Sequence, residues 1–178
     1  MNEEFMQLPD YERAGKGGHK MILPVTGTEY AKVFAELYNS ANMLFSENER
    51  ADAGEEAFYR QLRKDCNFLY IIEGEACGFM SWHKYAGYYE LTSLYVKRSY
   101  QGRKVGHELL TYFEGGITED ACILIKVLKN APWALNFYKK HGYETLNEET
   151  RELLKSWNIK EKSWENIFFK QWKMRERQ

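Results

Sequence analysis

The apolar and polar residues of the chain follow helical and strand periods in turn. Between residues 30 and 44 apolar side chains recur every three or four positions, which predicts a helix with one buried face. A short apolar strand at 21–25 precedes it, and Thr26 and Glu29 have the capping-box spacing of a helix start. A second helix is predicted after Asp52, and its inward-facing side chains are Phe58, Tyr59 and Leu62.

Strand-like runs follow these two helices. Residues 68–72 and 76–83 are apolar on either side of a short glycine-containing turn, which predicts a β-hairpin, and residues 88–96 form a third run. The next helix ends at 115–116, and its buried face consists of Val105, Leu109, Tyr112 and Phe113. The nearly continuous apolar run 121–128 is typical of a strand covered on both faces.

The C-terminal part contains one more clearly bounded helix. Asn130 can cap its start, Pro132 suits its first turn, and Gly142 suits a left-handed residue after its end. Its inner face is predicted to hold Ala134, Phe137, Tyr138 and His141. Strands are predicted at 143–146 and 167–172, separated by a helical insertion at about 147–163.

This order of elements predicts an α/β (α+β) fold with a mixed central sheet and helices on both faces. Residues 1–20 have no sustained period and are expected to form an N-terminal arm, whereas residues 21–178 are long enough for a single domain. The formal net charge of −1 gives no reason to expect nucleic acid, and the basic stretch 170–177 is interpreted as a solvated chain end.

Cysteine and histidine positions do not point to a metal or a disulfide framework. The three cysteines are widely spaced and are interpreted as small buried thiols, with a catalytic Cys–His pair as the alternative: Cys66, Cys77 and Cys122. The four scattered histidines are His19, His83, His107 and His141. No apolar run reaches the roughly 18 residues of a membrane span, and the acidic N-terminus lacks a signal sequence, so a cytoplasmic location without membrane contact is expected.

Candidate chemistry concentrates in the run 96–106, which leads a strand through a glycine-bearing turn into a helix. The first N–H groups of a helix have no partner within the helix and lie at the positive end of its dipole, so phosphates bind there. Gly102 and Gly106 let the backbone approach a bulky pyrophosphate.

Two motifs in this order resemble the GNAT acetyltransferase superfamily. The first is the acetyl-CoA loop Gln/Arg-x-x-Gly-x-Gly/Ala, which aligns on residues 101–106 after the strand 90–96. The second is a helix motif matched by Asn130, Ala134, Phe137, Tyr138, Lys140, Gly142 and Tyr143. The resemblance covers residues 21–146 and implies a mostly antiparallel sheet of about seven strands.

The resemblance also implies an acetyl-CoA-dependent N-acetyltransferase acting on a primary amine. Pyrophosphate would be held by the loop residues Gln101, Gly102, Arg103, Lys104, Val105, Gly106 and His107. Pantetheine and the acetyl carbonyl would meet the backbone of Leu94, Tyr95 and Val96. Tyr138 matches the family's general acid and Asn130 a cofactor contact; no metal is implied.

Glu90 is the candidate general base, with an exposed strand carboxylate as the alternative. Tyr85, Tyr88 and Tyr89 could form an aromatic wall for a cationic amine or be ordinary strand residues. One loop position departs from the motif, because Lys104 replaces its first glycine. A positive φ there would strain a lysine, but we expect the helix to have begun by then.

Several properties stay open at this level. The acceptor could be a small amine or polyamine, which we favour, an amino acid, an antibiotic or a protein. A CoA-binding sensor or scaffold without turnover is the alternative from another class. The aromatic last strand could form the edge of a homodimer.

Overall fold

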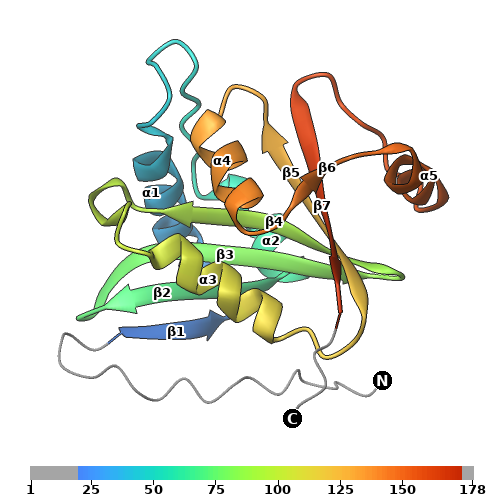
Figure 1. Ribbon diagram of the computed structural model, residues 1–178. Coiled ribbons are helices and arrows are strands. Elements are labelled where there is room, and N and C mark those ends of the chain that lie inside the picture. The colour runs from blue at the N-terminus through green and yellow to red at the C-terminus, as the bar shows by residue number, and fades with distance from the viewer. Residues whose placement is uncertain (1–19, 174–178) are drawn as a thin grey trace. The chain divides into compact units, whose positions relative to one another are not determined.

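The computed structural model describes residues 20–173, so the predicted N-terminal arm lies almost entirely outside the described residues. Within them, seven strands form one sheet in the order β1-β2-β3-β4-β5-β7-β6 (Figure 1). Only β4 and β5 pair in parallel among the registered pairs, and the others are antiparallel. The predicted mixed, mostly antiparallel sheet is therefore confirmed.

The described residues divide into two compact units, residues 20–83 with 93–118 and residues 84–92 with 119–173. The described part of the first unit contains β1, β2, most of β3, the end of β4, and three α-helices. Their bounds are β1 Lys20–Val25, α1 Ala31–Asn42, α2 Glu56–Lys64, β2 Cys66–Ile72, β3 Glu75–Tyr85, β4 Tyr88–Val96 and α3 Val105–Gly115, with 3₁₀ turns η1 Thr28–Tyr30 and η2 Arg98–Tyr100.

Helices cover both faces of the sheet in this unit (Figure 1). Phe79 stacks on Phe34 of α1 and meets Phe58 of α2 edge to face. Its neighbour Gly78 faces Val105 on α3. Because consecutive strand residues point to opposite faces, α3 packs on the side away from α1 and α2. Each fully buried phenylalanine contributes about 1.5–3 kcal/mol through removal from water.

The second unit holds the start of β4 and the remaining elements: β5 Ala121–Leu128, α4 Pro132–Lys140, β6 Glu144–Thr145, α5 Glu148–Ser156 and β7 Glu165–Trp172. Its strands are also covered on two faces. Ile167 packs in a cluster with Leu154 of α5, whereas the next residue, Phe168, meets the ring of Tyr138 on α4. The predicted insertion therefore contains one helix, α5.

Helix starts differ most from the sequence prediction. No side-chain cap is formed at Thr26, because a 3₁₀ turn begins after Gly27, whose φ is 104°, and α1 starts only at Ala31. Ala131, not Asn130, is the N-cap of α4. A complete capping box instead begins α5, where Asn147 and Thr150 bond reciprocally.

One further expectation about packing is wrong. Tyr59 is 37% exposed, because α2 turns only Phe58 and Leu62 inward as buried side chains. The last strand, β7, pairs with β5 along its full length and with β6 at Phe168 and Phe169. A homodimer edge at β7 stays a prediction.

Candidate functional site

The predicted phosphate turn lies in the first unit, between η2 and α3. Gly102 has a φ of 76°, and a Cβ there would meet no atom within 4 Å, so its glycine is needed for conformation rather than for space. Lys104 is the N-cap of α3 with φ 66° and ψ 2°, a left-handed conformation. The expectation that the helix has begun at Lys104 is wrong, and the lysine adopts the strained conformation that the motif's glycine would adopt freely.

The first turn of α3 provides the donors that an anion needs. Glu108 makes the first backbone bond of the helix, donating its N–H to the Lys104 carbonyl at 2.9 Å. Residues 105–107 precede this bond and form the first turn of α3, at the positive end of the helix dipole. Arg103, Lys104 and His107 are exposed at this end. Val105 is buried instead, with 2% exposure.

Side chains before the turn fix its path. Gln101 donates its amide N–H to the Val96 carbonyl at 3.0 Å, which ties the turn to the end of β4. The Gln101 side chain therefore acts on the backbone of its own loop. Arg98 donates its backbone N–H to Ser40 Oγ at 3.1 Å and a guanidinium N–H to the Met43 carbonyl at 3.3 Å, which attaches the same segment to the end of α1.

The segment Leu94–Val96 offers backbone rather than side-chain chemistry. The Tyr95 ring stacks on Phe79 and meets Tyr38 edge to face, and burial raises the pKa of this phenol. The Tyr95 carbonyl lies 2.8 Å from where a Cβ of Gly78 would be, so β3 approaches β4 closely only because residue 78 is glycine. The registered ladder between β4 and β5 ends at Leu91.

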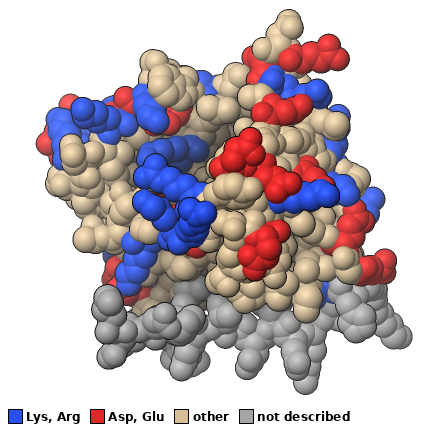
Figure 2. Space-filling model, turned by 180° about the vertical axis from the view of Figure 1, so that it is seen from behind, with Lys and Arg blue, Asp and Glu red and all other residues tan. Residues whose placement is uncertain are grey.

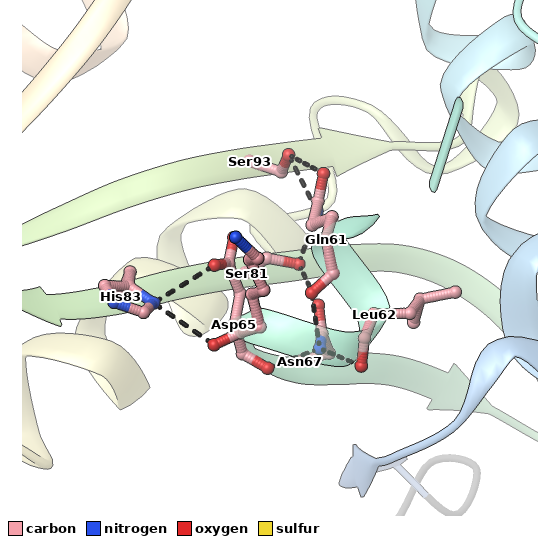
Figure 3. Close-up of polar contacts among 8 residues, drawn as sticks. Gln61, Leu62, Asp65, Asn67, Ser81, His83 and Ser93 are labelled. Atoms are coloured by element: carbon pink, nitrogen blue, oxygen red, sulfur yellow. Dashed lines mark hydrogen bonds and ion pairs between the residues drawn. The ribbon is translucent and has the colours of Figure 1, made fainter. Parts of the chain in front are cut away.

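A buried polar network supports this part of β4 from the α1 and α2 side (Figure 3). Gln61 on α2 donates to Ser81 Oγ at 2.6 Å on β3 and to Ser93 Oγ at 3.0 Å on β4. Ser81 in turn donates to Asn67 Oδ1 at 2.7 Å on β2. Satisfied buried hydrogen bonds of this kind fix one arrangement of the strands, and no local sequence pattern predicts them.

The other predicted site residues lie in the second unit. Tyr138 is the buried residue of α4, 6% exposed, with its ring edge-on to Phe137 and Tyr143. Asn130 is exposed just before the Ala131 cap. Tyr138 thus has a rigid aromatic surround, which suits either a core residue or a held acid.

Glu90 has a charged partner on the neighbouring strand that was not predicted from the sequence. Its Oε1 lies 2.7 Å from Nζ of Lys126 on β5, and its side chain is only 12% exposed. The exposed-carboxylate alternative is therefore wrong. Lys126 is the one charged residue in the apolar run 121–128, and that exception was the available signal.

The three tyrosines do not form one wall. Tyr88 is stacked between Tyr85 at 4.7 Å and Trp157 at 4.6 Å between ring centroids. Tyr89, which alternates to the other face of the strand, donates its hydroxyl to Glu119 at 2.9 Å. Burial, followed by the charges of Glu90 and Tyr85, raises the pKa of Tyr88 to about 12.

The cysteines are poor candidates for nucleophiles. Cys77 is fully buried as predicted, Cys122 is half-buried, and Cys66 lies among the exposed residues, which corrects the prediction for it. Burial raises the pKa of all three thiols, and Asp65 adds to the effect at Cys66. A raised pKa keeps the unreactive thiol form at neutral pH.

Charged side chains in the described part are mixed in sign. Figure 2 shows patches of basic and acidic residues on one face, as expected for a chain with net charge −1. Residues 20–173 contain no group of three or more His, Cys, Asp and Glu side chains arranged to hold a metal ion. None of the helices there combines the length and apolar character that a membrane span requires.

Part of the chain matches a known protein family. Residues 64–145 match the family described as acetyltransferase (GNAT) domain. No curated protein sequence matches the chain.

Solved structures share the fold at low sequence identity. An acetyltransferase from Thermus thermophilus is 17% identical with a TM-score of 0.68, over 85% of this chain and 96% of its own. The PaiA N-acetyltransferase from Thermoplasma acidophilum in complex with coenzyme A is 17% identical with a TM-score of 0.63, over 86% and 99%. The ribosomal-protein-S18-alanine N-acetyltransferase from Escherichia coli is 14% identical with a TM-score of 0.64, over 89% and 97%.

The matched segment 64–145 includes the phosphate turn, β4, β5 and α4, and thus both motifs noted in the sequence. The match over residues 64–145 agrees with the resemblance to the GNAT acetyltransferases noted in the sequence, and the solved structures share the fold.

Proposed function

We propose that the protein transfers the acetyl group of acetyl-CoA to a primary amine by direct attack in a ternary complex. The observation that carries the proposal is the turn at the start of α3, where the exposed cations Arg103 and Lys104 immediately precede the first turn of the helix. Main-chain donors at a helix N-terminus and nearby cations together form a site for a pyrophosphate.

The chemistry requires a neutral amine, a polarised thioester and a proton for the leaving group. The amine nitrogen attacks the acetyl carbon, the new C–N bond forms, and the C–S bond breaks. In our proposal the backbone of Leu94–Val96 stabilises the developing oxyanion, and Tyr138 gives its phenolic proton to the CoA thiolate. Glu90 accepts, through water, the proton that the ammonium loses before the attack. The nitrogen loses its second proton after the C–N bond forms, and solvent carries a proton back to Tyr138 to restore the phenol.

Glu90, the proposed base, forms an ion pair with Lys126. Lys126 Nζ, 2.7 Å from Oε1, holds the carboxylate in place at the junction of β4 and β5. The same pair could serve only to join β4 to β5. Glu90→Gln keeps the shape of the side chain and removes its charge, so it separates the two roles.

Calorimetric titration with acetyl-CoA tests the binding half of the proposal. Saturable binding is expected, and no heat of binding at millimolar acetyl-CoA would refute it. The catalytic half is tested by thiol release from acetyl-CoA with a panel of small amines, polyamines, amino acids and peptides. Tight binding without product from any amine would favour a CoA-binding module instead.

The acid role is tested with two matched tyrosine variants. Tyr138→Phe should lower kcat by about 100-fold, in the range of general acid catalysis, and leave acetyl-CoA affinity nearly unchanged. Tyr143→Phe is the control, because its ring packs against Tyr138 in the same core and the family motif accepts phenylalanine there. Equal kcat values for the two variants would remove Tyr138 from the mechanism.

A protein acceptor is the second candidate. The specific observation is that one similar fold belongs to an enzyme named for acetylating a ribosomal protein. Activity on peptides with none on free amines would support this candidate over the small amines that we favour.

A further inference from the structure

A surface cluster in the first unit links the start of β3 to the phosphate turn. Glu75, the first residue of β3, uses both carboxylate oxygens: Oε2 accepts the Tyr100 hydroxyl at 2.6 Å, and Oε1 lies 2.5 Å from Lys97 Nζ. Lys97 and Tyr100 frame the 3₁₀ turn η2, which leads directly into the turn at 101–104. The Glu75 carboxylate thus binds residues at both ends of η2.

The Tyr100 ring carries the next contact toward the turn. The Arg103 guanidinium carbon lies 5.2 Å from the centre of this ring, within cation–π range. The backbone N–H of Arg103 also donates to the Tyr100 carbonyl at 3.4 Å. Arg103 lies between the two left-handed residues of the turn, Gly102 and Lys104. A ring fixed at its hydroxyl by Glu75 therefore limits where the guanidinium can lie.

Stability does not account for this arrangement. The Glu75 and Lys97 side chains are 48% and 37% exposed, and surface ion pairs of this kind contribute little to folding. Hydrogen bonds from Lys97 and Tyr100 hold the pKa of Glu75 below its usual range, and the bond to Glu75 raises the pKa of Tyr100. At neutral pH the carboxylate is charged and the phenol keeps the proton that it donates.

We propose that Glu75 and Tyr100 are positioning residues for Arg103, and that they preorganise its guanidinium toward a phosphate ligand at the start of α3. This inference rests on the proposed function, since the phosphate is taken to be the pyrophosphate of acetyl-CoA. An exposed arginine loses side-chain freedom when it binds an anion, and a support that restricts it beforehand lowers this cost. Glu75 also offsets the charge of Lys97, which leaves Arg103 and Lys104 as the cations beside the turn.

The test compares two acyl donors that differ only beyond the pantetheine. Acetyl-CoA contains the pyrophosphate, and S-acetylpantetheine does not. In Tyr100→Phe, which keeps the ring and removes its bond to Glu75, the KM for acetyl-CoA should rise about threefold to tenfold with kcat retained. The KM for S-acetylpantetheine should be unchanged. Tyr100→Leu, which removes the ring, should show a larger effect of the same kind.

Glu75→Ala should reproduce the Tyr100→Phe result, and Glu75→Gln, whose carbonyl still accepts from Tyr100, should recover part of the affinity. Glu73→Gln is the matched control, because it removes the same charge two residues away and should leave both KM values unchanged. Equal changes with the two donors, or no change with acetyl-CoA, would overturn the proposal. Failure of the wild-type protein to bind acetyl-CoA would refute the proposed function instead, so the two failures are distinguishable.

Discussion

Replacing Lys104 by glycine should stabilise the protein. Its φ of 66° lies in the left-handed region, which costs a residue with a Cβ about 1–2 kcal/mol relative to glycine. Glycine also adds freedom to the unfolded chain, and this opposing effect is about 0.4–1 kcal/mol. The difference predicts that Lys104→Gly raises the free energy of unfolding by about 0.5–1 kcal/mol.

The assay is urea unfolding of the wild type and three variants, with thermal unfolding as a second measure. For a chain of this length, that gain corresponds to a rise in Tm of about 1–4 °C. Lys104→Ala removes the charge but keeps the Cβ, so it should not stabilise. Gly102→Ala introduces a Cβ at φ 76°, where no atom lies within 4 Å, so it should destabilise by about 1–2 kcal/mol from the backbone alone.

The reasoning is refuted if Lys104→Ala stabilises as much as Lys104→Gly, because the charge and not the conformation would then be responsible. It is also refuted if Lys104→Gly destabilises. The same variants show whether the ammonium binds phosphate. If the ammonium contacts the ligand, its loss should weaken acetyl-CoA binding equally in Lys104→Ala and Lys104→Gly. If Lys104 makes no contact with the ligand, both variants should keep the wild-type affinity.

Three further outcomes follow from the second unit. Trp157→Ala should lower the free energy of unfolding by about 2 kcal/mol, because it removes the ring stacked on Tyr88. Trp164 is 59% exposed, so Trp164→Ala should change the free energy of unfolding by less than about 0.5 kcal/mol in the same denaturation assay. The pKa of Tyr88 is raised in the folded protein, so its contribution to stability is fully present below pH 10 and is lost as the pH rises to about 12. Tyr88→Phe has no phenol to ionise. Its free energy of unfolding, measured at each pH, should therefore fall less than that of the wild type between pH 10 and 12. Glu90→Gln should lower kcat by about 100-fold if the carboxylate is the base, with acetyl-CoA affinity unchanged; a loss of stability with kcat retained would leave it only a structural partner of Lys126.

Periodicity predicted most of the elements because each depends on residues close together in the chain. The run 88–96 coincides with β4 and the run 121–128 with β5. The hairpin turn also follows from local chemistry: Glu73 and Gly74 both have positive φ, as a tight turn between twisted strands requires. Helix starts were less predictable, since Asn130 and Asn147 are equally good caps by residue type, and only Asn147 lies in the cap position.

The partners of the site residues depend on register between segments far apart in the sequence, which no local pattern contains. Glu90 lies opposite Leu124 in the parallel ladder, and Lys126 is two residues further along the same face of β5. A shift of one residue in that register would turn Lys126 to the other face and leave Glu90 without its cation. The pairing of β4 with β5 therefore determines whether Glu90 has its cation. Substitutions in the apolar run 121–128 that alter this pairing should affect proton transfer even when Glu90 and Lys126 are unchanged.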